Sequence, residues 1–115
     1  MTGDEGNGPY YVILDVAIHD VATYLTYMDR VTPALEAAGG RYLSRGGALT
    51  TYEGDWNPPR IVLMEFPSRQ AWEGFYYGAE YEEIKPIRDQ VSTGRMIGVE
   101  GLPPGLAEAP RPSVG

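Results

Sequence analysis

The residue types best suited to chemistry gather in one stretch, RYLSRGGALTTYEGDW, which spans residues 41–56. Arg45 stands directly before Gly46 and Gly47 in this stretch. A guanidinium there can approach a ligand carboxylate or enolate, and the glycine N–H groups beside it carry no side chain that would block them. The sequence therefore predicts that Arg45 binds a ligand. The alternative is an arginine that pins a hairpin by pairing with the acidic residues that follow.

Two carboxylates and a tryptophan come after the glycines. Glu53 and Asp55 would supply a general base only in a dry site, whereas carboxylates in a turn are more often solvated. Trp56 precedes the tripeptide NPP, which cannot continue a strand. Trp56 is therefore either a packing plug under a rigid loop or a lid that keeps water from a ligand.

Further candidates lie on or near the predicted strands at residues 10–19 and 60–66. His19 is the only histidine of the chain, and histidine suits proton transfer near neutral pH, although a place at a strand end favours a solvated rim. Glu65 is either a ligand-binding residue or, by default, a partner in an ion pair with a neighbouring strand. Strand parity alone does not decide which candidates converge. The candidate catalytic residues are His19, Arg45, Glu53 and Asp15, and the candidate substrate-binding residues are Tyr11, Tyr42, Gly46, Gly47, Trp56 and Glu65.

Hydrophobic periodicity indicates the elements that must position these residues. Apolar residues alternate over residues 10–19, which predicts a strand. After Asp20 they recur at helical spacing, which predicts a helix. Asp20 is placed to cap the start of this helix, and Gly39-Gly40 marks its end. Pro33 inside that helix predicts a kink or a restart. The remaining segments predict strands at 41–45, 48–54, 60–66 and 93–101, and a helix capped by Ser68 that is interrupted near Gly78 and resumes at 80–92.

With the middle connection built around RGG and EGDWNPP, the order is strand, helix, strand, strand, helix, strand. This is an α+β, ferredoxin-like βαββαβ arrangement with both helices on one face of an antiparallel sheet. The folded domain is expected over residues 10–102, with mobile tails at 1–9 and 103–115. Tyr11, Ile13 and Leu43 are too apolar for an open sheet face. A second copy of the chain is therefore expected to cover that face as a homodimer.

Composition excludes several classes of function. With 115 residues the chain forms one domain, and a net charge of −7 with a single lysine argues against nucleic acid and anionic membranes. The absence of cysteine and the single histidine argue against a thiolate or multi-histidine metal site. A carboxylate site for Mg or Ca is not excluded, but no ligand spacing suggests one, so no metal is expected. No phosphate-loop or dinucleotide motif supports ATP, NAD or flavin, so no cofactor is expected either. Neither a signal peptide nor a membrane span is visible, so a cytoplasmic location is expected.

The segments GGRYLSRGG and YEGDWNPPRIVLMEFPS, together with YVILDVAIHDVATY, AWEGFYYGAEY and IRDQVSTGR, resemble the bacterial family described as domain of unknown function 1330. The resemblance spans about residues 10–101. It implies a ferredoxin-like fold of the dimeric α/β-barrel superfamily, whose related barrels include small monooxygenases, polyketide cyclases and haem-handling proteins. His19 departs from the small polar residue that members of this family often carry before the first helix.

Three functions fit these observations. The first is a cofactor-independent acid–base enzyme that cyclises or dehydrates a polyketide-like small molecule, with Arg45 stabilising an enolate and His19, Asp15 or Glu53 as the base. The alternative is a non-catalytic dimer that binds a small molecule through the same arginine. The third is a cofactor-free monooxygenase.

Overall fold

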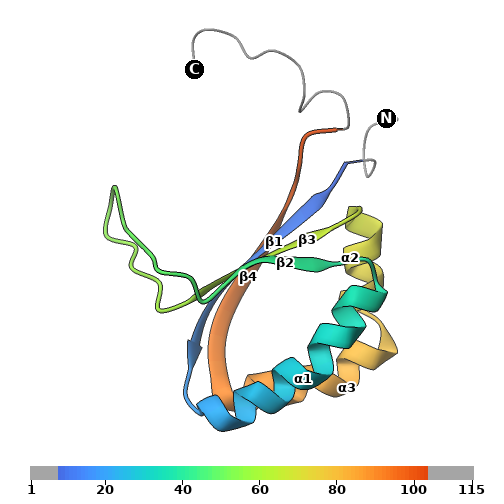
Figure 1. The fold of residues 1–115 in the computed structure, drawn as a ribbon, viewed down its shortest axis with the longest axis horizontal. Coiled ribbons are helices and arrows are strands. Elements are labelled where there is room, and N and C mark those ends of the chain that lie inside the picture. The colour runs from blue at the N-terminus through green and yellow to red at the C-terminus, as the bar shows by residue number, and fades with distance from the viewer. Residues whose placement is uncertain (1–7, 104–115) are drawn as a thin grey trace, which may run out of the picture.

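The computed structural model describes residues 8–103. One layer is a four-stranded antiparallel sheet, and three helices cover one of its faces (Figure 1). The strand order is β2-β3-β1-β4. The elements along the chain are β1 Tyr10–Ile18, α1 Val21–Ala37, β2 Arg41–Arg45, β3 Ile61–Phe66, α2 Arg69–Tyr76, α3 Ala79–Val91 and β4 Ser92–Glu100.

The predicted ferredoxin-like fold is confirmed, with the second helical stretch divided into α2 and α3 as its sequence indicates. The predicted caps also hold. Asp20 accepts a hydrogen bond from the Thr23 N–H at 3.1 Å, and Ser68 accepts one from the Ala71 N–H at 3.0 Å. Gly39 takes a positive φ of 90° just after α1.

Of the kink or restart expected at Pro33, the restart does not occur, because α1 continues through this residue as one helix. Pro33 is in the last turns of α1 and its ring is exposed. The proline cannot donate to the carbonyl one turn earlier. Tyr24, Tyr27, Val31 and Leu35 along the same helix are buried, and their packing holds α1 on the sheet.

The core follows from the alternation along the strands. Val12, Leu14 and Val16 of β1 point toward the helices and are at most 4% exposed. Val62, Met64 and Phe66 of β3 point the same way and are at most 6% exposed, and they pack with Leu35 and Trp72 from the helices in one cluster. The residues between them on each strand face away from the helices.

A strand at residues 48–54 was predicted, and this prediction was wrong. Residues 46–60 form one long connection without a strand, and β2 pairs directly with β3. The Gly46 N–H donates to the Ile61 carbonyl at 3.3 Å, so the chain continues along β3 and does not fold back on β2. Since β3 has β1 and β2 as its two neighbours, residues 48–54 find no free place beside it.

The expected tails fall mostly outside the described residues, which begin at Gly8 and end at Pro103. At the boundary the Gly101 N–H donates to the Pro9 carbonyl at 2.8 Å, which extends the pairing of β1 with β4 by one step. Among residues 8–103, no helix has the length and apolar character needed to cross a membrane.

Candidate functional site

A β-bulge in β2 decides where Arg45 points. Tyr42 pairs with Met64 and Arg45 pairs with Val62, and the register shifts between Tyr42 and Ser44. Met64 and Val62 both face the helices, so the extra residue brings Arg45 to the same side of the sheet as Tyr42, although the two are three positions apart. The Arg45 guanidinium carbon accordingly lies 4.6 Å from the centroid of the Tyr42 ring, a cation–π contact.

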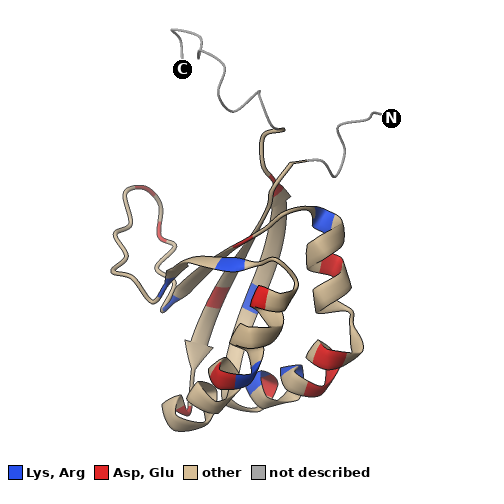
Figure 2. Ribbon diagram, turned by 45° about the vertical axis from the view of Figure 1, so that its right-hand side comes forward, with Lys and Arg blue, Asp and Glu red and all other residues tan. Residues whose placement is uncertain are grey.

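Arg45 lines a groove of about 560 Å³ at the end of the sheet, where α1 passes the β2–β3 connection. The part of the wall that α1 supplies is mostly apolar. Arg45 and Arg60, at the two ends of the β2–β3 connection, complete the wall. Figure 2 shows basic segments where the β2–β3 connection leaves and rejoins the sheet. The residues that line this groove, called the α1 groove below, are Ile18, Val21, Tyr24, Leu25, Met28, Asp29, Thr32, Pro33, Arg45 and Arg60.

Gly46 brings the second arginine close to the first. Its φ is +75°, and a Cβ on this residue would lie 2.5 Å from Arg60 Nη1, so any side chain here would collide with the guanidinium. The Nε atom of Arg60 is buried and has no hydrogen-bond partner within residues 8–103. Over the same residues neither Arg45 nor Arg60 forms an ion pair, so the hairpin pairing of Arg45 with Glu53 or Asp55 does not occur. Two guanidinium groups are therefore available in one groove.

Behind this groove, a second cavity of about 20 Å³ lies between the helices and the sheet, with room for about one water-sized group. Tyr24 and Met28 belong to the walls of both cavities, so they separate the groove from the inner cavity. Most of the inner wall is apolar. Its polar groups come from tyrosines and from Arg88 of α3.

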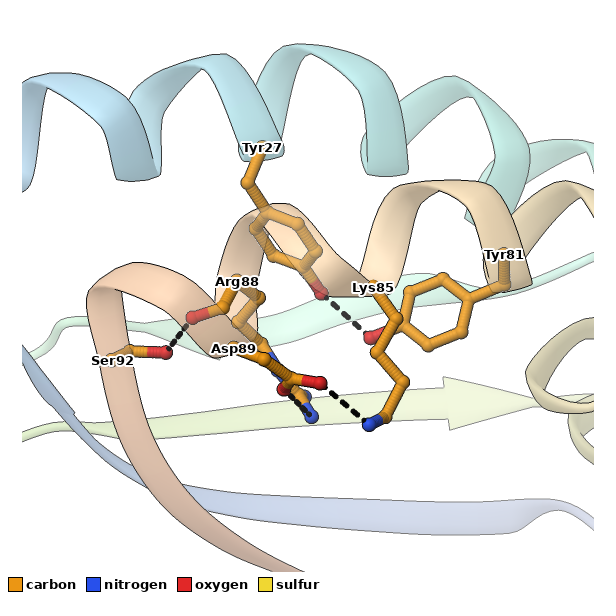
Figure 3. Close-up of polar contacts among 6 residues, drawn as sticks. All are labelled: Tyr27, Tyr81, Lys85, Arg88, Asp89 and Ser92. Carbon is orange, nitrogen blue, oxygen red and sulfur yellow. Dashed lines mark hydrogen bonds and ion pairs between the residues drawn. The ribbon is translucent and has the colours of Figure 1, made fainter.

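These inner polar groups form a small cluster (Figure 3). The hydroxyl of Tyr27 on α1 lies 3.0 Å from the hydroxyl of Tyr81 on α3, and burial raises the pKa of both phenols. Burial likewise raises the pKa of Tyr24, partly offset by the positive charges of Arg60 and Arg88. Arg88 reaches Asp89 through Nη2 at 3.6 Å, while its Nη1 is buried and has no hydrogen-bond partner among the described residues.

Asp15 and Trp56 meet on the other face of the sheet. The Trp56 Nε1–H donates to Asp15 Oδ2 at 3.1 Å, and the Arg95 Nε–H donates to the same oxygen at 3.2 Å. Trp56 itself is 53% exposed. The contact ties the long β2–β3 connection to the open face, and the Asp15 carboxylate already accepts two hydrogen bonds.

His19, Glu65 and Glu53 also do not line the α1 groove. The His19 Nε2 lies 3.0 Å from the Thr93 hydroxyl at the start of β4, and the side chain is exposed. Glu65 accepts from the Arg41 Nε–H at 2.6 Å, the cross-strand ion pair given as its alternative. Glu53 lines a separate groove of about 330 Å³ under the loop, beside Trp56.

Tyr11 and Gly47 do not line the α1 groove either. Tyr11 is on the open face opposite Glu65 and is half-buried. A Cβ on Gly47 would lie 3.3 Å from the Ser44 hydroxyl oxygen, which leaves modest room at that position. The structure thus divides the candidates, with Arg45 and Tyr42 on the helix side and most others on the open face.

Sequence reasoning passed over Arg60, Arg88 and the Tyr27–Tyr81 pair as site residues. The tyrosines follow helical spacing and resemble core residues, and Arg60 resembles a strand-flanking charge. The available signal was a polar tip on otherwise buried aromatic positions. In residues 8–103, no group of three or more histidine, aspartate or glutamate side chains is placed to hold a metal ion.

A family model described as a domain of unknown function (DUF1330) matches residues 9–102. No curated protein sequence matches the chain. Among solved structures, RPA0582, a protein of unknown function from Rhodopseudomonas palustris, aligns with a TM-score of 0.67 at 20% identity over 85% of each chain.

Two further structures share the fold. SnoaB, a cofactor-independent oxygenase from Streptomyces nogalater, aligns with a TM-score of 0.61 at 9% identity over 83% of this chain and 94% of SnoaB. A proposed antibiotic biosynthesis monooxygenase from Nitrosomonas europaea aligns with a TM-score of 0.54 at 16% identity, over 87% of this chain and 95% of that one. At these identities the likeness establishes the fold, and activity has to be argued from the site.

Proposed function

Because the chain belongs to the DUF1330 family, whose function is unknown, we propose a function from its own geometry: a cofactor-independent acid–base enzyme that acts on a small, oxygenated, partly apolar molecule. The observation that carries this proposal is the pair Arg45 and Arg60, which share the α1 groove and form no ion pair within residues 8–103. Guanidinium groups in that setting bind a carboxylate or stabilise an enolate oxygen.

Each part of the α1 groove takes a role in this proposal. Val21, Leu25 and Met28 hold the apolar body of the substrate against α1. Asp29 is the carboxylate that lines the groove, so we assign it the role of general base ahead of Asp15, Glu53 and His19, which do not line it. Asp29 is exposed, so the bound substrate has to exclude water from it.

The chemical step follows from these roles. The Asp29 carboxylate takes the proton from a carbon next to a carbonyl group, and the electron pair moves onto the carbonyl oxygen. Arg45 and Arg60 stabilise the resulting enolate. The enolate oxygen then forms a C–O bond to the carbon of a protonated carboxyl group, the bond from that carbon to its hydroxyl breaks, and the hydroxyl takes the proton from Asp29 and leaves as water. Ring closure of a polyketide-like acid to a pyrone is the reaction that we expect first.

Two other functions use the same groove. A non-catalytic binding protein needs only the arginine pair and the apolar wall. A cofactor-free oxygenase also begins with an anionic substrate, and the fold likeness to the oxygenase SnoaB favours it as the third candidate. In that reaction molecular oxygen oxidises the deprotonated substrate.

A homodimer is part of the proposal. Ile13 of β1 pairs with Leu63 of β3 on one side and with Ile97 of β4 on the other, which makes an apolar row across the open face. Ile97 is 65% exposed and Leu43 is 45% exposed. A second copy with the same row would bury these side chains.

The test uses 3,5-dioxohexanoate, a small polyketide-like acid that closes to a pyrone with loss of water. Pyrone formation is followed by absorbance and binding by calorimetry, for the wild type, Arg45→Met and the matched control Arg41→Met on the same strand. We expect Arg45→Met to lose at least about 2 kcal/mol in kcat/KM or affinity, while its free energy of unfolding changes by about 0–1 kcal/mol. Arg41→Met should retain the wild-type activity.

The outcomes separate the candidates. Binding without turnover favours the binding protein, and consumption of molecular oxygen during turnover favours the oxygenase. If the wild type neither binds nor converts the acid, or if Arg45→Met behaves like Arg41→Met, the assignment of the α1 groove is wrong.

A further inference from the structure

The inner cavity holds a buried cation whose hydrogen-bonding capacity is only partly used. Arg88 Nη1 is buried and has no partner within residues 8–103, while Nη2 is 3.6 Å from Asp89. A buried N–H without an acceptor costs free energy, and native proteins leave few such groups unpaired. An acceptor oxygen that enters the cavity would satisfy this group.

The phenols beside Arg88 add donors of the same kind. In the Tyr27–Tyr81 pair one hydroxyl donates to the other, so the accepting hydroxyl keeps its own proton to offer. Figure 3 shows the two phenols meeting between α1 and α3, with Arg88 extending from α3 toward the sheet. Both phenol oxygens and the guanidinium come from residues that line the same cavity.

The α1 groove ends against this cluster. Tyr24 and Met28 form the wall between the two cavities, and both Arg60 and Arg88 act electrostatically on Tyr24. Met28 is half-buried, and its unbranched side chain adapts easily to new packing. A rotation of Met28 would join the groove to the inner cavity. The joined space would have an arginine N–H without a partner at each end, on Arg60 and on Arg88.

We propose that the inner cavity is the second half of the ligand site, and that Arg88 with Tyr27 and Tyr81 binds a neutral oxygen, carbonyl or phenol, at the far end of an acid held by Arg45 and Arg60. The middle of this ligand is aromatic or otherwise planar and apolar, because Tyr24 and Met28 lie between the groove and the inner cavity, and Trp72 and Phe75 line the cavity itself. The inference rests on the proposed function, since the α1 groove supplies the anion-binding end.

The test compares aromatic acids that differ only in a distal hydroxyl. Three pairs vary the distance between the two ends: 4-hydroxybenzoate with benzoate, 4-hydroxyphenylacetate with phenylacetate, and 4-hydroxycinnamate with cinnamate. Calorimetry gives the Kd of each acid for the wild type, Arg45→Met, Arg88→Met, Tyr27→Phe and the control Tyr76→Phe. Tyr76 does not line the inner cavity, and its hydroxyl makes no hydrogen bond within the described residues.

We expect the wild type to prefer the hydroxylated acid by about 10-fold or more in at least one pair. Arg88→Met and Tyr27→Phe should each reduce that preference to within about 3-fold and leave the affinity for the acid without the hydroxyl nearly unchanged. Arg45→Met should weaken both members of a pair equally. Tyr76→Phe should behave as the wild type.

The failures are distinguishable. If the acids bind through Arg45 but no pair shows a preference, the inner site is wrong and the proposed function stands. A preference that survives both Arg88→Met and Tyr27→Phe also contradicts the inner site. If none of the six acids binds the wild type, the anion-binding groove itself is contradicted.

Discussion

The two faces of one sheet have opposite characters in this protein. On the helix side, Val12 and Phe66 are fully buried, and Met64 is 6% exposed. On the open side, Ile97 and Val99 are 65% and 49% exposed. The same strands supply both faces, so the difference comes from what covers them.

The polar groups of the two faces differ in the same way. On the open face the charged side chains already have partners, as Arg41 has Glu65 and Arg95 has Asp15. On the helix side, Arg60 and Arg88 each keep a buried N–H without a partner among residues 8–103. The open face therefore lacks an apolar cover, and the helix side lacks hydrogen-bond acceptors. The first need suits a protein partner and the second suits a small ligand.

The largest expected effect is on the helix-covered face. Phe66→Ala should lower the free energy of unfolding by about 3–5 kcal/mol, because the ring is fully buried against Trp72 and Phe75 and its removal leaves a cavity. Denaturant unfolding measures this loss. Leu63→Ala on the open side of the same strand is the control and should cost under about 2 kcal/mol at concentrations too low for dimerisation. Equal losses would remove the distinction between the faces.

The next effect concerns the open face. Ile97→Lys places a charge in the apolar row opposite Ile13, and should weaken the proposed dimer by about 100-fold, or about 2.7 kcal/mol. Light scattering at micromolar concentration measures the mass. Gln90→Lys, at an exposed position of α3, makes the same change in charge and should leave the dimer intact. A wild-type monomer, or an Ile97→Lys dimer of unchanged stability, would contradict the proposed pairing.

Much of the fold could be predicted from local signals. The alternation of apolar residues predicted which side chains of β1 are buried, because successive side chains of a strand point to opposite faces and only one face of this sheet is covered by helices. Asp20 and Ser68 marked the starts of α1 and α2 through their capping oxygens. These features depend on neighbours within a few residues, so the sequence carries them directly.

The candidate site could be predicted only in part, because it depends on non-local geometry. Arg45 was expected as a ligand residue, yet its face is decided by a bulge that strand parity does not reveal. The 48–54 strand failed for a similar reason, since it competes for a strand edge that β1 and β2 already occupy. Arg88 and Tyr27 line one cavity only because α1 and α3 pack side by side on the sheet.

The smallest expected effect is on the pH dependence of stability: at alkaline pH, the free energy of unfolding reports whether the inner phenols are buried. Burial raises the pKa of Tyr27 above the value of about 10 that the residue has in the unfolded chain. Below about pH 10 both states keep the proton and this group has no effect on the pH dependence. Above that pH the unfolded chain loses the proton and the folded protein keeps it, so the unfolded state binds fewer protons and stability falls as pH rises.

Each such phenol contributes a slope of about 1.4 kcal/mol per pH unit above pH 10, until the folded protein also loses the proton. Tyr27→Phe should therefore flatten the fall in the free energy of unfolding by about that amount per pH unit, measured by denaturant titration between about pH 9 and pH 11.5. Tyr52→Phe, which removes the hydroxyl of a ring that is 88% exposed, should follow the wild-type curve. Because the comparison is between slopes, a general loss of stability in either variant does not affect it. If the Tyr27→Phe slope equals the wild-type slope, Tyr27 is not a buried neutral phenol, and the contrast between the dry helix side and the open face loses its clearest electrostatic support.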